Sequence, residues 1–149
     1  MIEIIEKLQS TTFQSTPLTN SRLKYLSNIA QITEDHVSRI GLGLSISKGN
    51  IRTDWKPSEL ENENSIISNS SKEKHLRSKT LFKDELPIWL GLILQYQNPG
   101  DYNSWRTISK LHWERGVEIL MEKSLENGDW IRTINSCFNT SKWGFLNDR

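Results

Sequence analysis

The segment from residue 33 to residue 46 constrains the fold more than any other part of the sequence. Thr33 is a favourable helix N-cap, and Glu34 and Asp35 follow in the first turn, where carboxylates interact well with the helix dipole. The apolar residues of this helix fall on two faces, with Val37, Ile40 and Leu44 on one and Leu42 and Ile46 on the other. A helix with two apolar faces needs two surfaces to cover it.

Two glycines interrupt the same helix. Gly41 and Gly43 each cost about 1 kcal/mol relative to alanine in a helix interior, so a closely packed partner is expected. Gly41 and Ser45 lie four residues apart and form a notch of small side chains. The pattern fits a helix that crosses the same helix of a second copy, which predicts a homo-oligomer. It also fits a helix buried within a single chain.

Residues 11–17 alternate between two faces and predict a short strand that Pro17 closes, because proline cannot donate to a β-ladder. One face carries Thr12, Gln14 and Thr16, and the other carries Thr11, Phe13 and Ser15. Thr19 is the expected N-cap of a following helix, whose apolar side consists of Leu23, Leu26 and Ala30. The order of strand, helix and helix predicts a ribbon-helix-helix-like unit.

The middle of the chain, residues 49–79, shows no apolar period. Its segment 59–71 is polar and of low complexity, so we expect a long, mobile polar loop here. Apolar character returns at residues 76–82, which predict a strand or the approach to a helix.

Two further helices are expected after this loop. Asp84 is the expected N-cap of the first, and residues 88–94 are apolar all round, which predicts a central buried helix. A turn at residues 98–101 precedes a long helix at 103–126, and Gly128 ends it. The core stripe of the long helix consists of Trp113, Val117, Leu120 and Met121, and its expected outer face carries Glu114, Glu118 and Glu122.

The C-terminal tail, residues 128–149, repeats large apolar residues every four positions. Trp130, Ile134 and Phe138 are expected to cover the core of the same chain, with Trp143 and Phe145 after them. The alternative is that the tail is a docking peptide for a partner. The 149 residues therefore predict one mainly α domain with its core at about 10–126. It would comprise a ribbon-helix-helix-like N-terminal unit, two long packed helices and a long polar loop.

The sequence offers no catalytic or metal-binding pattern. Its three histidines and its single cysteine lie on separate segments without metal-ligand spacing; they are His36, His75, His112 and Cys137. A lone cysteine cannot form an internal disulfide, and the acidic residues near the N-terminus are unlike a signal peptide. The longest apolar run, residues 86–94, is too short to cross a bilayer. We therefore expect a cytoplasmic protein that is not an enzyme and needs no metal, cofactor or membrane.

Charge is unevenly distributed although the net charge is only +1. Residues 7–83 contain twelve lysines and arginines against seven acidic residues, whereas residues 84–129 contain four against eight. One interpretation is a basic surface for a polyanion in the first half and a different surface in the second. The other is two solvated surfaces of opposite bias.

Three segments together resemble the DndE family of bacterial DNA phosphorothioation (DNA sulfur modification) systems. Residues 26–33 and 38–46, in which Arg39 precedes a small-apolar stretch ending in Leu44-Ser45, are similar to the first helix pair of that family. Residues 79–85, with the apolar residues 89–94 after them, are similar to its lead-in and central helix. His112-Trp113-Glu114-Arg115-Gly116 resembles a helix motif of the family that begins with His. Met or Trp stands second in this motif, any residue third, Arg fourth and Gly fifth. The segments follow the family's order over roughly residues 20–125.

The chain also departs from that family. Lys83-Asp84 stands where the family has a glycine before an acidic residue, and Ala30-Gln31-Ile32 replaces a turn that carries a basic residue and a glycine. The insert at 59–71 and the tail at 130–149 have no counterpart in the family.

The resemblance implies a self-associating helical domain, a tetramer, that serves as a non-enzymatic DNA-binding accessory subunit. Its partners would be double-stranded DNA, including nicked duplex, and DndC-like and DndD-like proteins that replace a non-bridging phosphate oxygen with sulfur. Arg39 matches the family arginine, and charge and position suggest further phosphate contacts. The expected DNA-binding residues are Arg39, Lys48, Arg52, Lys56, Arg77 and Lys79.

Two other functions fit the same residues. A ribbon-helix-helix transcriptional regulator would read bases in the major groove through Thr12, Gln14 and Thr16. A pure assembly protein would use its apolar stripes and tail to dock proteins and would not bind DNA.

Overall fold

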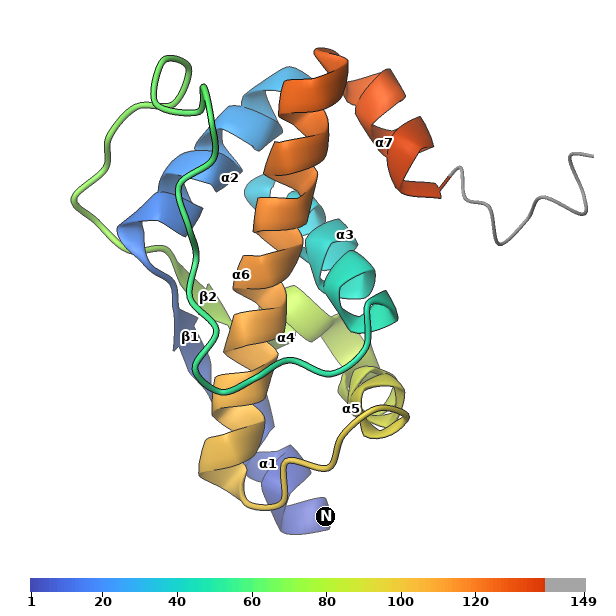
Figure 1. The fold of residues 1–149 in the computed structure, drawn as a ribbon. Coiled ribbons are helices and arrows are strands. Elements are labelled where there is room, and N and C mark those ends of the chain that lie inside the picture. Colours follow the sequence, from blue (N-terminus) through green and yellow to red (C-terminus); the bar gives the residue numbers. More distant parts are fainter. Residues whose placement is uncertain (139–149) are drawn as a thin grey trace, which may run out of the picture.

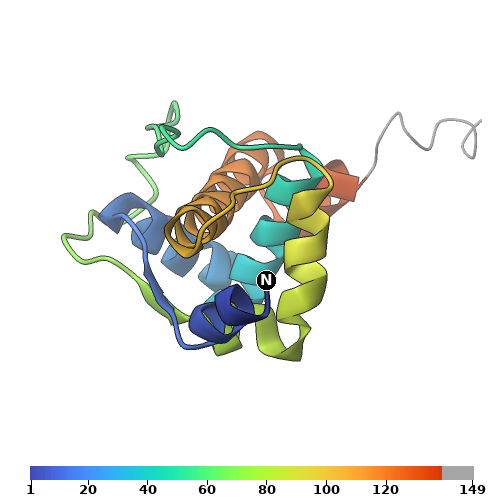
Figure 2. The same cartoon turned by 90° about the horizontal axis from the view of Figure 1, so that it is seen from below.

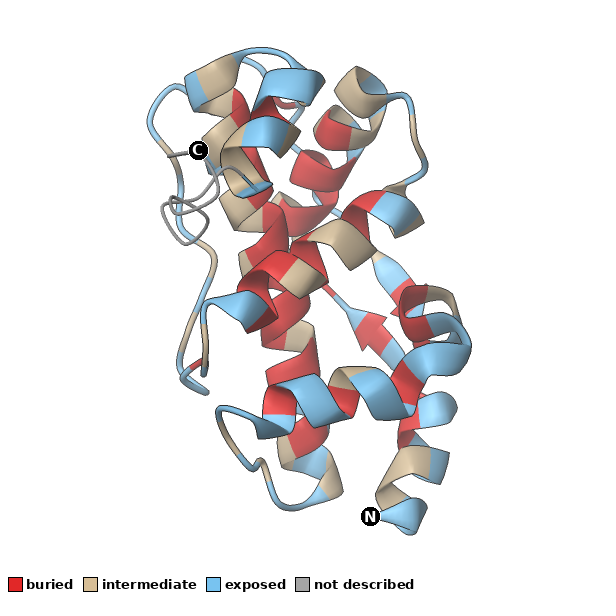
Figure 3. Cartoon of the chain, turned by 90° about the vertical axis from the view of Figure 1, so that its right-hand side faces the viewer, coloured by how far each residue is buried: buried red, intermediate tan, exposed pale blue. Residues whose placement is uncertain are grey.

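The computed structural model describes residues 1–138, which are mainly α-helical (Figure 1). The elements follow the order α1 (Ile2–Gln9), β1 (Thr12–Gln14), α2 (Pro17–Ala30), α3 (Glu34–Ser47), β2 (His75–Arg77), α4 (Ser78–Phe82), a 3-10 turn at Lys83–Glu85, α5 (Leu86–Leu94), α6 (Tyr102–Asn127) and α7 (Trp130–Phe138). Helix α6 runs the length of the molecule, and the other helices are arranged around it. Buried residues gather along the inner sides of these helices (Figure 3). The expected mainly α class is confirmed, although only α6 is a long helix in the second half.

Helices α3 and α6 cross with their backbones in contact at Gly41 and Gly116. A Cβ atom on Gly116 would lie 1.8 Å from the carbonyl oxygen of Gly41, and one on Gly41 would lie 2.9 Å from the carbonyl carbon of Gly116. No side chain fits at either position, so the notch in α3 receives α6 of the same chain. Both apolar stripes of α3 contribute buried residues to this chain's core: Val37, Leu42, Leu44 and Ile46. The second copy expected at this helix is therefore not needed to cover it.

The residues around Gly116 hold α3 in place from the α6 side. Trp113 Nε1 donates to Ser38 Oγ at 2.9 Å, and His112 Nδ1 lies 2.8 Å from Ser45 Oγ. Arg115 Nη2 donates to the main-chain oxygens of Ser45 at 2.7 Å and Gly49 at 3.1 Å, which are carbonyl groups in the last turn of α3 and just after it. The segment 112–116 is thus the packing and capping element of this helix crossing.

Strands β1 and β2 pair antiparallel within one chain, with Phe13 opposite Leu76. These two side chains are buried, and the ring of Phe13 packs edge-on against that of Phe82 at a centroid distance of 5.9 Å. The apolar segment 76–82 therefore supplies a strand and then a helix. The N-cap of α2 is Thr16 rather than Thr19, because Thr16 Oγ1 accepts the Thr19 amide at 3.3 Å. Pro17 opens the helix at a position where no amide donor is needed.

The glutamates of α6 do not all face outward, contrary to expectation. Glu114 is 1 % exposed, and its Oε2 accepts the hydroxyls of Thr16 at 2.7 Å and Thr19 at 2.6 Å and the Thr16 amide at 3.0 Å. Glu118 Oε1 accepts from Arg22 Nη1 at 2.9 Å, whereas Glu122 is exposed. Two of the three carboxylates therefore accept hydrogen bonds from the start and first turns of α2 and connect this helix to α6.

The long polar segment has little regular structure, as expected, but its middle is packed onto the core. Arg22 Nε donates to Glu63 Oε2 at 2.6 Å, and both side chains are 0 % exposed. Ile51, before Glu63 in the sequence, and Ile67, after it, are also buried. The expectation of a mobile loop is therefore wrong at Glu63, because one acidic residue in a low-complexity run meets a core arginine 41 residues earlier.

Helix α5 lies at the edge of the molecule and not at its centre, which corrects a second expectation. Its inner side buries Leu86, Leu90 and Ile93, while Ile88 is 61 % and Leu92 38 % exposed. Figure 2 shows α5 beside α3 with its other side free of described elements. Asp84 does not cap α5; it lies in the 3-10 turn, and Glu85 is the N-cap.

The C-terminal elements follow the sequence pattern in part. Gly128 ends α6 with a φ of 85°, and α7 follows along it. Trp130 and Ile134 are half-buried against the core, whereas Phe138 is 60 % exposed. The expectations for Trp143 and Phe145 lie outside the described residues.

We expect Gly116→Ala to destabilise the fold by about 3 kcal/mol, because its methyl group would meet the backbone of α3. Gly91→Ala is the matched control. Nothing lies within 4 Å of its Cβ position, so this change should stabilise by about 1 kcal/mol. Urea unfolding followed by circular dichroism measures both. Equal effects of the two changes would contradict the backbone contact.

Removing Glu63 should release the polar segment. Glu63→Ala leaves Arg22 buried without its main partner, which costs about 3–5 kcal/mol, whereas Glu61→Ala changes an exposed residue and should cost little. Limited proteolysis between residues 56 and 74 should be faster in Glu63→Ala than in the unchanged protein or the control. Equally rapid cleavage in all three would mean that the ion pair does not hold the segment.

Candidate nucleic-acid interface and an adjoining groove

The structure divides the six expected DNA-binding residues between two sides of α6. Arg39, Arg77 and Lys79 belong to the side of α3, β2 and α4, whereas Lys48, Arg52 and Lys56 belong to the end of α3 and the segment after it. That segment crosses α6 on the face opposite β2 and α4 (Figures 1 and 2). One flat surface does not hold all six.

Two of the six are already engaged within the chain. Arg39 is half-buried, and its Nη1 donates to the Thr80 carbonyl at 2.7 Å, which links α3 to α4. Arg52 forms two hydrogen bonds with the Asp54 carboxylate, each at 3.0 Å, in a fully solvated pair. Arg77 and Lys79 are exposed, and neither forms an ion pair within residues 1–138. Lys48 and Lys56 are also exposed.

The outward side of the β-ribbon carries polar and basic side chains only, and we call it the ribbon face. It consists of Thr12 opposite Arg77 and Gln14 opposite His75, all exposed. Strand alternation places these four on the side away from Phe13 and Leu76. Thr16 does not belong to this surface, because Glu114 and the start of α2 engage its hydroxyl. The base-reading set expected from sequence therefore loses one of its three members.

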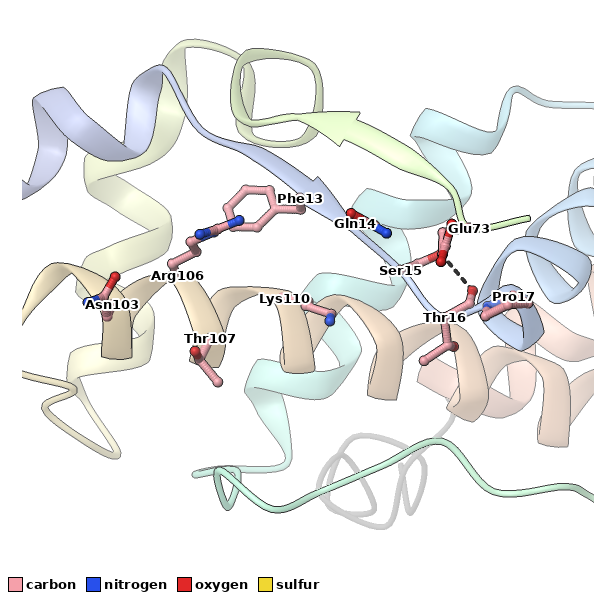
Figure 4. A pocket seen from close by; sticks show the side chains of 10 residues that line it. All are labelled: Phe13, Gln14, Ser15, Thr16, Pro17, Glu73, Asn103, Arg106, Thr107 and Lys110. Atoms are coloured by element: carbon pink, nitrogen blue, oxygen red, sulfur yellow. Dashed lines mark hydrogen bonds between the residues drawn. The ribbon is translucent and has the colours of Figure 1, made fainter. Parts of the chain in front are cut away.

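A groove of 680 Å³, the β1–α6 groove, lies beside the ribbon (Figure 4). Residues 13–17 form one wall and Glu73 lines it as well. The other wall is α6, which contributes Asn103, Arg106, Thr107 and Lys110. Arg106 extends toward Phe13, and Lys110 projects from α6 one turn further along the helix.

Sequence reasoning missed Arg106 and Lys110. Both fall in the half of the chain with an acidic excess, so counting charges along the sequence did not indicate a basic surface there. Their spacing of four residues on a long helix was the available signal, because such residues share one face.

The buried titratable groups serve packing in this structure. Burial, together with the nearby positive charge of Arg115, lowers the pKa of His112 to about 4, so the ring is neutral at physiological pH. Burial raises the pKa of the Cys137 thiol and keeps it protonated. Within residues 1–138, no group of three or more His, Cys, Asp and Glu side chains is placed to hold a metal ion. No helix in this part of the chain is long and apolar enough to cross a membrane.

Comparison of the chain with protein-family models, with curated proteins and with solved structures finds no match. The residues of the ribbon face and the groove therefore carry the functional argument, together with the resemblance of the three sequence segments.

Proposed function

We propose that this chain is a non-enzymatic DNA-binding accessory subunit of a bacterial DNA phosphorothioation complex. The observation that carries the proposal is the ribbon face, where Arg77 and His75 lie beside Thr12 and Gln14 without a carboxylate among them. Lys79 follows directly at the start of α4. The resemblance of three segments to the DndE family is the reason for proposing the phosphorothioation pathway. DndC-like and DndD-like partners would carry out the sulfur chemistry.

The shape of the ribbon is compatible with duplex DNA. The major groove admits a two-stranded β-ribbon, and cations at its end can contact phosphates on the groove edge. Each strand has only three residues, so few side chains can reach base edges. Binding through Arg77 and Lys79 would therefore depend little on sequence and strongly on salt.

A nicked duplex should bind at least as well as an intact one. A nick lowers the cost of bending the backbone, so a rigid basic surface can meet more phosphates. The transcriptional-regulator alternative differs in one respect: it requires Gln14 to discriminate among base pairs.

The outer side of α5 favours a second candidate, an assembly protein. Ile88, Leu92 and Leu94 of α5, with Tyr96 just after the helix, are between 38 % and 61 % exposed. No charged residue occurs between Leu86 and Gly100. Exposed apolar patches of this kind mark protein contacts. A homo-oligomer, with a tetramer as the expected form, would use this surface and not the Gly41 notch, and DNA binding does not exclude it.

Reversing the charge at Arg77 or Lys79 should weaken binding to all duplexes alike. Each lost phosphate contact should also flatten the slope of log K against log salt by about 0.9. Mobility shifts at low salt, with intact, nicked and single-stranded probes, measure both effects. Arg52→Glu is the matched control, because it makes the same charge change on the opposite face at a residue already paired with Asp54.

Three results would revise this proposal. No shift with any probe would remove DNA binding and leave the assembly protein. An equal loss of affinity in Arg52→Glu would show that overall charge and not the ribbon face governs binding. A large loss for one sequence alone in Gln14→Ala would favour the transcriptional regulator.

Introducing charge on α5 should weaken self-association without unfolding the chain. Ile88→Asp alters a side chain that is 61 % exposed, whereas Gln95→Asp makes a charged change at an exposed polar residue nearby. Light scattering at tens of micromolar should show an oligomer for the unchanged protein and for Gln95→Asp, and smaller species for Ile88→Asp. A monomer in all three cases would contradict the homo-oligomer.

A further inference from the structure

The free edge of β1 faces the β1–α6 groove. In the antiparallel ribbon the odd-numbered residues bond to β2: the Ser15 amide donates to Lys74 O and the Ser78 amide to Thr11 O, each at 2.9 Å. The main-chain groups of Thr12 and Gln14 therefore point away from β2. The next even-numbered amide, that of Thr16, donates to Glu114 on α6 at 3.0 Å, so this edge is directed toward α6.

Glu114 occupies only one end of this edge. Its carboxylate satisfies the Thr16 amide, while the amide and carbonyl of Gln14, beside the groove, form no hydrogen bond within residues 1–138. An unpaired strand edge is a template for another extended chain. Residues 13–16 line the groove before α2 begins at Pro17 and span roughly 13 Å of extended backbone, which is enough for a short segment to lie alongside.

The wall opposite this edge is basic. Arg106 is exposed and forms no ion pair within residues 1–138. Lys110 Nζ lies 3.9 Å from Glu114 Oε1, but the other oxygen of that carboxylate already accepts three hydrogen bonds. Glu73, near Pro17, is the one acidic residue among those that line the groove. The groove thus combines backbone hydrogen bonding on one side with positive charge on the other.

We propose that the β1–α6 groove binds an extended acidic segment of a partner protein, which adds a strand to β1 and places carboxylates against Arg106 and Lys110. Strand addition supplies affinity through main-chain hydrogen bonds, and the charged wall selects acidic side chains. A DNA backbone fits less well, because phosphate oxygens only accept hydrogen bonds and would face the Gln14 carbonyl. This site uses the main chain of Gln14 and the α6 wall, whereas the ribbon face uses the Gln14 side chain, and the proposal does not depend on DNA binding.

Gln14→Pro tests the proposal most directly. Proline removes the amide donor of residue 14, which the β1–β2 ladder does not use, so the ribbon itself should persist. Gln14→Ala is the matched control, because it removes the side chain and keeps the donor. The probe is a short fluorescent peptide of alternating aspartate and valine, compared with a lysine-valine peptide by fluorescence polarisation.

The acidic peptide should bind the unchanged protein and Gln14→Ala alike. Gln14→Pro should bind it roughly three- to tenfold more weakly, as the loss of one hydrogen bond predicts. Arg106→Glu should also weaken binding, and added salt should do the same. In the unchanged protein, hydrogen exchange at the Gln14 amide should slow when peptide is added, a readout that needs no variant.

Several outcomes would overturn the proposal. These are no binding of the acidic peptide, preference for the lysine peptide, equal affinity in Gln14→Pro, or no added protection at the Gln14 amide. Displacement of the peptide by duplex DNA would assign the groove to the DNA surface instead. Loss of DNA binding in Arg77→Glu with peptide binding intact would separate this site from the ribbon face.

Discussion

The backbone contact between Gly41 and Gly116 is the constraint on which the rest of the structure depends. Because neither glycine carries a Cβ atom, α3 and α6 approach closely enough for Ser38 to reach Trp113 and for Ser45 to reach His112. A wider separation would leave these buried polar groups unpaired, and each would then cost about 1–3 kcal/mol. The same approach lets Arg115 cap the end of α3. One pair of glycines thus fixes both the packing and the hydrogen bonding of the central layer.

Buried carboxylates form the second set of constraints, and they tie distant parts of the chain to α6. Glu114 accepts hydrogen bonds from the threonines at the start of α2. Arg22 forms ion pairs with both Glu63 of the polar segment and Glu118 of α6. Buried ion pairs contribute little net stability, but breaking one leaves an uncompensated charge. This asymmetry makes them suited to fixing one arrangement of a segment that has few apolar residues of its own.

Local signals in the sequence predicted most of the elements, although they placed the N-caps of α2 and α5 at the wrong residues, and they did not predict the long-range pairing. Thr33 caps α3 and Gly128 ends α6 as expected, because each depends on its immediate neighbours. The helical period places Glu114 on the same face as Glu118 and Glu122. It does not reveal that the hydroxyls of Thr16 and Thr19 donate hydrogen bonds to Glu114. The same holds for α5, where an all-apolar helix can equally be central or can expose half its surface.

The candidate site illustrates the same limit in electrostatic terms. Charge counted along the chain placed the basic surface in the first half, yet folding puts Arg39 against a carbonyl and pairs Arg52 with Asp54. It also brings Arg106 and Lys110, from the acidic half, to the edge of β1. What matters for a partner is which charges remain unpaired beside which backbone groups. Arg77 flanks the polar outer face of this ribbon and Arg106 its free edge, and neither forms an ion pair within residues 1–138, so one small element can present two chemically different surfaces.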